Sequence, residues 1–267
     1  MLVTVIVDAF RQNEAPALAF AINDICAATD HYGWSSAGLY CFWDYYTRDI
    51  YYIGLAEDLA LRFKQHTGLT DCNPKGCKAG QIRNYFLSHE CLGYSIFVQA
   101  SQMQPATAQV QKKLSLTKAM LDDWPEDGMG DVKLNEGWLI KAHERLGEKP
   151  QWNSIGGSRA GAACESSYEV TLLGNMTASQ RGPLLAHSSI REISDDNAPY
   201  AWYEELLHGA RMRMVLFGVT LEAGLQMVRD EYEANIGSDF GVDELIESGY
   251  LTKVPSLPDI TTRAGQS

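Results

Sequence analysis

Long uninterrupted apolar runs are absent from this 267-residue sequence. No stretch approaches the roughly 18 apolar residues that a membrane helix requires, and the apolar N-terminal run meets Asp8 without a basic leader before it. Cysteine is also sparse: six are scattered along a chain long enough to build a core without disulfide bonds. We therefore expect a cytoplasmic protein with reduced thiols and no membrane partner, rather than a disulfide-framed secreted domain.

Basic residues are scarce as well. The chain has 22 Lys and Arg against 34 Asp and Glu, a net charge of −12, and an acidic surface repels a polyanion such as nucleic acid. The deficit is uneven, because residues 161–267 hold 7 basic and 16 acidic side chains, whereas residues 60–120 hold 8 basic and 2 acidic ones. We call residues 60–120 the basic island, and it is compatible with a local nucleic-acid-binding surface on an acidic chain.

Hydrophobic residues make up 45% of the sequence, which is enough for a folded core. Runs of β-branched and aromatic residues bounded by turn residues predict strands over 2–7, 38–43, 50–54 and 93–98. Helical periodicity and capping residues predict helices over 14–29, 58–66, 78–88, 106–122, 133–146, 200–217 and 221–235. The middle of the chain is therefore expected to contain a three-stranded sheet with helices around it.

Amino-acid composition and predicted elements divide the chain into three parts. Residues 1–35 form an N-terminal strand–helix extension, and residues 36–155 contain the hairpin and the basic island. A stretch rich in Gly, Ser and Ala over 154–167 reads as a flexible linker. Residues 156–267 are predicted to form an acidic, mostly helical accessory region, which could serve as an interaction surface, a dimerisation element or an autoinhibitory mimic of DNA.

The residues that carry chemistry lie on the predicted hairpin and on the helix that follows it. Tyr40 and Tyr52 are on adjacent strands, and Arg62 and His66 are four residues apart on one helix face. A guanidinium stabilises charge on phosphoryl oxygens, while a phenol or an imidazole can manage the protons of an attacking water. Glu136, on a later helix, is the candidate carboxylate ligand for a divalent cation. This combination of side chains indicates an enzyme that cleaves phosphodiester bonds.

The same residues give the sequence a resemblance to the GIY-YIG endonuclease family. Its two name motifs match Gly38-Leu39-Tyr40 and Tyr52-Ile53-Gly54, with Leu39 in place of isoleucine, an apolar exchange of similar volume. The arginine, histidine, metal-binding glutamate and late asparagine of the family match, in order, Arg62, His66, Glu136 and Asn153. The resemblance covers about residues 36–153, and the run from Glu136 to Asn153 resembles the restriction-enzyme branch.

This resemblance implies a small α+β fold, with a three-stranded antiparallel sheet flanked by helices, that cleaves DNA with one Mg²⁺ or Mn²⁺. Tyr40 would be the general base or its relay, helped by His66, and Tyr52 would position the water or the phosphate. Arg62 would neutralise charge in the transition state, and Glu136 would hold the metal. Asn153 would tie elements of the site together. A restriction or anti-phage role follows from the same branch.

Several alternatives stay open at the level of sequence. Lys75, Lys78 and Arg83 follow the site helix and could contact substrate phosphates, with Lys78 the first choice. Cys72 and Cys77, with His66, His89 and Cys91 nearby in sequence, could form a zinc site, although no tight C-x2-C pair is present. Instead of an endonuclease acting on double- or single-stranded DNA, the chain could be a noncatalytic or regulated nucleic-acid-binding protein. It could also be a nuclease toxin or effector that uses its acidic region to bind a protein partner or a second copy.

Overall fold

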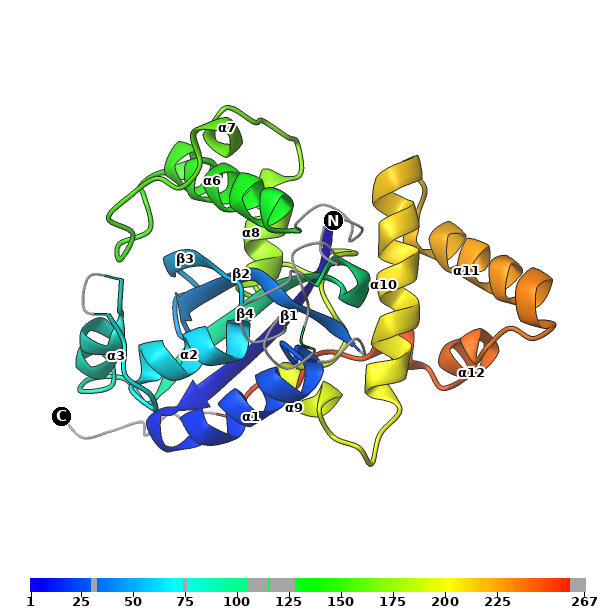
Figure 1. Ribbon diagram of the computed structural model, residues 1–267, viewed down its shortest axis with the longest axis horizontal. Helices are drawn as coiled ribbons and strands as arrows, with labels where there is room; N and C mark the ends of the chain where they lie inside the picture. Colours follow the sequence, from blue (N-terminus) through cyan, green and yellow to red (C-terminus); the bar gives the residue numbers. More distant parts are fainter. Residues whose placement is uncertain (30–32, 74–75, 105–114, 116–127, 260–267) are drawn as a thin grey trace.

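The fold is α+β and is built on one antiparallel sheet (Figure 1). The computed structural model describes residues 1–29, 33–73, 76–104, 115 and 128–259. Four strands pair in the order β1-β4-β2-β3, with the bounds Leu2–Arg11 for β1, Trp34–Asp44 for β2, Ile50–Ala56 for β3 and Cys91–Ala100 for β4. The expectation of three strands was wrong by one, because the N-terminal strand pairs with β4 over its whole length instead of forming an extension.

Hairpin β2–β3 forms where the aromatic and β-branched runs predict it. Tyr40 lies directly opposite Gly54 in the pairing of the two strands. The turn between them is stabilised by Asp44, whose carboxylate accepts hydrogen bonds from the backbone N–H groups of Tyr46 and Thr47 at 2.7 and 2.8 Å. This is the local bonding that Asp offers in turns.

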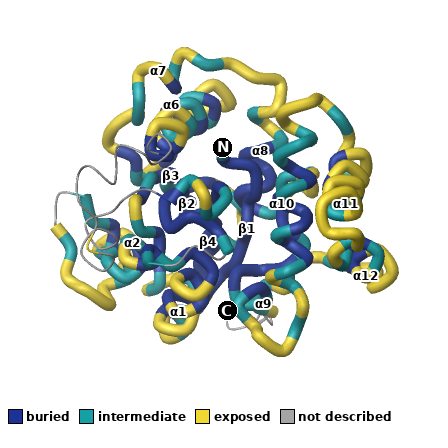
Figure 2. The backbone as a smooth tube through the Cα atoms, turned by 45° about the vertical axis from the view of Figure 1, so that its right-hand side comes forward, coloured by how far each residue is buried: buried dark blue, intermediate teal, exposed yellow. Residues whose placement is uncertain are grey.

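Helices cover both faces of the sheet and bury a separate apolar cluster on each (Figure 2). The cluster on one face includes side chains of α1 (Ala15–Ile25), α2 (Leu59–Thr67), α3 (Ala79–Tyr85) and α9 (Ile190–Ile193). The cluster on the opposite face includes side chains of α6 (Met129–Leu146) and α8 (Glu169–Met176). Strand residues are buried on both sides, so the sheet is the inner layer of a three-layer arrangement.

Capping residues set the ends of the helix that follows the hairpin. Asp58 is the N-cap of α2 and accepts a hydrogen bond from the Leu61 N–H at 2.8 Å. Gly68 ends the helix in the left-handed conformation, with φ of 79°, which glycine adopts without a Cβ clash. The helices predicted over 133–146, 200–217 and 221–235 are confirmed with shifted ends, whereas the helix expected over 106–122 falls almost entirely outside the described residues.

Both outer strands of the sheet are covered by segments distant in the sequence. On the β1 side, the Val5 N–H donates to the Leu184 carbonyl and the Ala186 N–H donates to the Val5 carbonyl, each at 2.8 Å. On the β3 side, the Trp152 N–H donates to the Tyr51 carbonyl at 2.8 Å. These bonds occupy backbone groups that an open edge strand would present to other chains.

The C-terminal region is packed on the sheet rather than set apart from it. Helix α10 (Tyr200–Phe217) stands beside β1, with α11 (Leu221–Ile236) and α12 (Val242–Glu247) on its far side (Figure 1). Inside the contact, Arg211 and Glu204 form a fully buried ion pair of 2.8 Å. Arg211 also donates to the Leu185 carbonyl at 3.1 Å, so the pair fixes α10 to the segment that covers β1.

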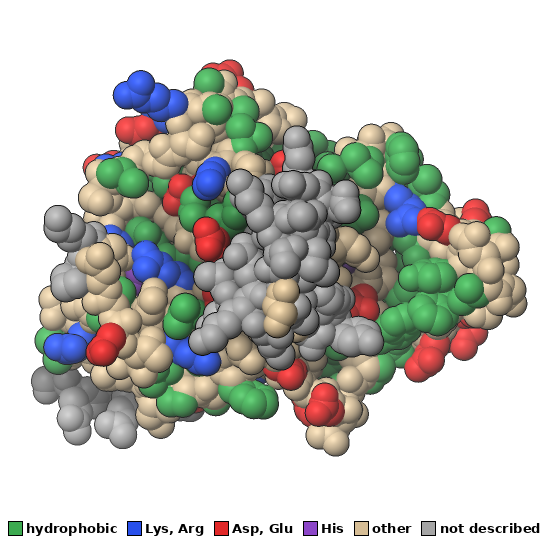
Figure 3. All heavy atoms as spheres, in the orientation of Figure 1, with side chains coloured by type: hydrophobic (Ala, Val, Ile, Leu, Met, Phe, Trp, Pro, Cys, Tyr) green, Lys and Arg blue, Asp and Glu red, His purple; other side chains and the backbone are tan. Residues whose placement is uncertain are grey.

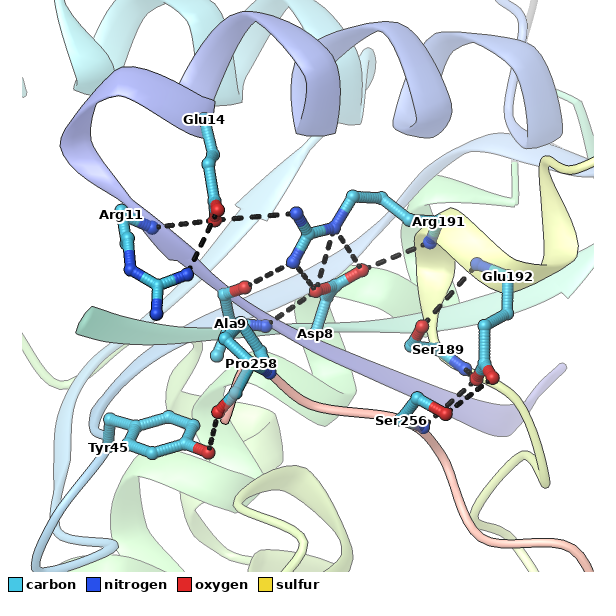
Figure 4. A network of polar contacts seen from close by, with 10 residues as sticks. All are labelled: Asp8, Ala9, Arg11, Glu14, Tyr45, Ser189, Arg191, Glu192, Ser256 and Pro258. Atoms are coloured by element: carbon cyan, nitrogen blue, oxygen red, sulfur yellow. Dashed lines mark hydrogen bonds and ion pairs between the residues drawn. The ribbon is translucent and has the colours of Figure 1, made fainter. Parts of the chain in front are cut away.

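A second polar network joins α9 and the C-terminal segment to β1 (Figure 4). The guanidinium of Arg191 contacts the buried carboxylate of Asp8 at 2.8 Å. Ser256 donates to Glu192 at 2.7 Å, and the Tyr45 hydroxyl donates to the Pro258 carbonyl at 2.6 Å. Within the described part of the chain, no helix is long and apolar enough to span a bilayer.

The stretch expected to be a flexible linker packs tightly against α6. An added Cβ on Gly137 would lie 2.2 Å from the Ser158 carbonyl oxygen, and one on Gly161 would lie 1.9 Å from the Leu134 carbonyl oxygen. Only glycine permits backbones to approach this closely. Residues 157–162, which include the short helix α7 (Arg159–Ala162), therefore form a clasp on α6; the domain boundary itself stays a prediction.

Candidate active site

Two phenols lie side by side where β2 and β3 pair. The rings of Tyr40 and Tyr52 are 5.7 Å apart between centroids. A Cβ at Gly54 would lie 2.7 Å from the Tyr40 hydroxyl and 2.6 Å from the Tyr52 ring. Glycine at this position therefore leaves the space in which the two rings meet, which is a physical reason for the residue type in Tyr52-Ile53-Gly54.

The hydroxyl of Tyr40 receives two donors from α2. His66 lies with Nε2 at 2.7 Å from the Tyr40 hydroxyl, and Arg62 donates from Nε at 3.2 Å. The other ring nitrogen of His66 accepts a hydrogen bond from the backbone N–H of Lys78 at 2.9 Å. Because Nδ1 is an acceptor, the proton of the neutral imidazole resides on Nε2, and His66 donates to Tyr40.

This arrangement differs from the expected role of His66 as an assistant base. Burial, together with the charges of Arg62 and Lys78, lowers the pKa of His66 to about 3, so the ring is neutral. With its proton on Nε2, it offers Tyr40 a donor and no acceptor. The third polar neighbour of the Tyr40 hydroxyl is the Tyr52 hydroxyl, and their interaction raises the pKa of Tyr40 and lowers that of Tyr52.

The two phenols differ in their access to solvent. Tyr40 is fully buried, whereas Tyr52 is partly exposed. Burial raises the pKa of both hydroxyls, and the hydrogen bond from Tyr40 and the charge of Arg62 oppose that rise at Tyr52. Tyr52 is therefore the phenol that an entering water or phosphate meets first, with Tyr40 behind it.

Lys78 is the one predicted phosphate contact that reaches these rings among the described residues. It ends the loop before α3, and its Nζ lies 4.8 Å from the centre of the Tyr52 ring. Burial and the neighbouring charge of Arg62 lower the pKa of the Lys78 amine. Arg83 is exposed and lines a different, small cavity with residues of β1 and α1, and Lys75 lies outside the described residues.

Glu136 comes to the site from the opposite side of the hairpin, on α6. Its charge raises the pKa of Tyr52, and the Leu55 amide on β3 donates to its carboxylate. Burial raises the pKa of Glu136 to about 7, and no cationic side chain among the described residues opposes the rise. A Cβ at Gly157 would lie 3.3 Å from its carboxylate, so the clasp on α6 lies against this carboxyl.

Glu136 offers a single carboxylate that could contribute to the coordination of a hard divalent cation. Mg²⁺ is commonly bound by one or two carboxylates, with water and substrate phosphate oxygens completing its coordination. A half-buried carboxyl without a cationic partner meets that requirement, because metal binding supplies the positive charge that the site lacks. Glu136 is thus the residue able to hold such an ion here.

Asn153 holds the edge of the sheet beside the phenols. Its side-chain carbonyl accepts from the Ile53 N–H at 2.9 Å, and its amide donates to the Ile53 carbonyl at 2.8 Å. The side chain thereby imitates a neighbouring strand at the point where Tyr52 and Gly54 are held. Its expected role in tying elements together matches these two bonds.

The residues weighed for a zinc site are not assembled into one. His66 is engaged at both ring nitrogens, and Cys91 is buried on β4. Over the residues that the structure describes, no three His, Cys, Asp or Glu side chains form a group able to hold a metal ion. Cys72 and Cys77 remain free thiols near Arg62.

Two features of the site were not predicted from the sequence. The Lys78 backbone N–H sets the proton position of His66, but a backbone donor has no residue signature. The clasp residues Gly157 and Ser158 lie in the Gly-rich stretch 154–167, whose composition indicated a flexible linker rather than close backbone packing.

Comparisons with family models, curated proteins and solved structures return no match for this chain.

Proposed function

We propose that this chain is a metal-dependent endonuclease of the GIY-YIG type, hydrolysing phosphodiester bonds of DNA. The observation that carries the proposal is that an arginine of α2 and a carboxyl of α6 without a described cationic partner lie beside a phenol pair on one hairpin. Tyr40 and Tyr52 contact each other, Arg62 contacts Tyr40, and Glu136 lies across from Tyr52. A structural role alone would not require a half-buried carboxyl without a cation partner.

The chain's own residues suggest how the reaction would be organised. Tyr52 orients the attacking water, and Tyr40 acts as the base in its phenolate form: the Tyr52 hydroxyl passes its proton to the Tyr40 oxygen as it takes up the proton of the water. N–H donors from His66 and Arg62 face that oxygen and favour negative charge on it. Glu136 would hold Mg²⁺ or Mn²⁺, which when bound supplies charge stabilisation at the phosphate and the leaving oxygen.

The surface charge is compatible with an acidic protein that approaches DNA over a limited area. Figure 3 shows Lys and Arg side chains mostly on the left of this face, the side of α2, α3 and α6, whereas acidic side chains rim the right, where α10 to α12 lie. Phosphate contacts would then be made on the side of the phenol pair, and binding would weaken as salt is raised. The acidic region is left for a second copy or a protein partner.

Cleavage of supercoiled plasmid and of single-stranded DNA with Mg²⁺ tests the proposal. We expect wild-type cleavage, with Glu136→Ala and Tyr40→Phe reduced by at least about 100-fold. Glu144→Ala and Tyr168→Phe are matched controls, because both side chains are exposed and distant from the phenols. Full activity in Glu136→Ala or Tyr40→Phe would contradict the site. Metal-independent DNA binding without cleavage would favour the noncatalytic alternative.

A further inference from the structure

A second cavity lies at the end of the sheet away from the hairpin turn, between β2, the end of β4 and helices α10 and α11. Its volume is ≈ 320 Å³, within the lower range of small-ligand sites. Trp34 begins β2, the strand that also carries Tyr40, and lines this cavity together with side chains of α10 and α11. The cavity is therefore on the same sheet as the candidate active site but shares no lining residue with it.

The walls of this cavity are aromatic. Trp34, Trp202 and Tyr232 all line it. Trp202 and Tyr232 each lie 4.6 Å from the ring of Phe240, between centroids, so Phe240 holds two of the three rings in place. Planar rings from two helices and one strand offer stacking surfaces to a flat ligand.

His208, one of the residues that line the cavity, has a buried ring N–H without a partner among the described residues. His208 Nδ1 lies 3.3 Å from the indole N–H of Trp34 and 2.8 Å from the Thr4 hydroxyl. Because an indole nitrogen only donates, Nδ1 is an acceptor and the ring proton resides on Nε2. That buried N–H has no hydrogen-bond partner within the described chain, and burial lowers the pKa of His208 to about 3, so the ring stays neutral.

One polar wall of the cavity is a carboxyl. Glu205 lines the cavity, and its one favourable polar neighbour is the Gly33 N–H, while burial raises its pKa. Among the described residues that line the cavity there is no Lys or Arg, and the nearby guanidinium of Arg211 is paired with Glu204. From these residues a phosphate or carboxylate would meet the Glu205 carboxyl without a countercharge, whereas an uncharged group with an N–H would pair with it.

We propose that this cavity binds a nucleobase, stacked on Trp202 and Tyr232 above the buried Trp34, with Glu205 accepting a base N–H. The sugar and phosphate of the nucleotide lie outside the cavity, toward solvent. The bound base belongs to a free nucleoside or to an unstacked nucleotide of a strand. The proposal does not depend on cleavage, since it concerns residues that take no part in the phenol pair.

Titration calorimetry of the full chain with nucleosides tests this site. We expect at least one of adenosine, guanosine, cytidine and uridine to bind, and its 5′-monophosphate to bind no more tightly. Caffeine stacks but has no N–H donor, and should bind at least about tenfold more weakly. Glu205→Leu and Trp202→Ala should each weaken nucleoside binding by about tenfold or more.

Two controls keep the result interpretable. Glu222→Leu removes an exposed carboxylate on α11 that does not line this cavity, and should leave binding unchanged. A melting curve for each variant shows that it is folded. Absence of binding by every nucleoside, equal binding of caffeine, or unchanged binding in Glu205→Leu would each overturn the proposal. Binding of N-acetyl-tryptophanamide in preference to nucleosides would assign the cavity to a peptide instead.

Discussion

At the residue scale, the site combines a carboxyl and an imidazole whose proton affinities are shifted in opposite directions by the same burial. Burial raises the pKa of Glu136 to about 7 and lowers that of His66 to about 3. Both groups are therefore neutral over part of the ordinary pH range, because a charge in this pocket is unfavourable unless a ligand compensates it. Each shift couples protonation to the free energy of unfolding.

Replacing Glu136 with Gln should stabilise the protein at alkaline pH. The folded-state pKa lies above the unfolded value, so the contribution of the carboxyl is favourable below about pH 4.5 and is lost as the pH rises through about 7. After allowance for its partial exposure, we expect Glu136→Gln to raise the free energy of unfolding by about 1–2 kcal/mol at pH 8, with little effect at pH 5. Urea unfolding at both pH values measures this, with Glu144→Gln as the exposed control, and a loss of stability at pH 8 would contradict it.

His66 should make the protein sensitive to acid. Its folded-state pKa is below the unfolded value of about 6.5, so stability is complete above that pH and falls as the pH decreases toward about 3. His66→Gln keeps a donor for Tyr40 but does not titrate. Between pH 6 and 4, we expect the wild type to lose about 1.4 kcal/mol per pH unit more than this variant. Identical slopes in urea unfolding would show that His66 is accessible to protons in the folded state.

At the scale of elements, edge strand β3 depends on a side chain 100 residues away in sequence. Asn153 satisfies both the N–H and the carbonyl of Ile53, and these are groups that a further strand would otherwise have paired. The position of Tyr52 follows, since it precedes Ile53 on the same strand. The position of Glu136 likewise depends on a segment distant in sequence, because the backbone of Ser158 in the clasp contacts that of Gly137 on α6.

Replacing Asn153 with Asp should disturb this edge specifically. The carboxylate can still accept from the Ile53 N–H, but it cannot donate to the Ile53 carbonyl and repels it. We expect a loss of about 1–3 kcal/mol in the free energy of unfolding, together with faster amide exchange at the edge of β3. Asn84→Asp on the exposed face of α3 is the matched control. Equal stability of the two variants would mean that the paired bonds contribute little.

How well the sequence predicts an element of this fold depends on how far apart in the sequence its interacting residues are. The hairpin, the helix over 58–66 and the placement of Tyr40 and Tyr52 on adjacent strands follow from local patterns, and they were predicted. The place of β1 beside β4 depends on pairing across some 80–100 residues, which no local pattern encodes. The packed clasp was missed for a related reason, because close glycine contacts and flexible glycine linkers share one composition.

At the scale of the whole molecule, the helical C-terminal region stabilises the sheet that carries the candidate site. Arg211 and Glu204 are both fully buried, and Arg211 reaches the Pro183 and Leu185 carbonyls beside β1. Opening this contact would expose an ion pair together with apolar surface on α10. The region therefore cannot be removed without affecting β1.

Replacing Arg211 alone should be more damaging than replacing both partners. Arg211→Met leaves the Glu204 carboxylate buried without its cation, for which we expect a loss of about 3–5 kcal/mol in the free energy of unfolding. Adding Glu204→Gln removes that charge and should recover part of the loss. Chemical denaturation of the two variants checks this, and a double variant less stable than Arg211→Met would show that the carboxylate is satisfied by Tyr250 and the His187 N–H.

The covering of β1 by residues 184–186 has a consequence for how the chain is made. On the ribosome, β1 emerges before the partner of its outer edge, which follows some 180 residues later. At bacterial or eukaryotic elongation rates of about 5–20 residues per second, that interval is on the order of ten seconds or more. During it, a hydrophobic strand is exposed along one side. The nascent chain therefore has to keep this edge out of contact with other strands until residues 184–186 are made.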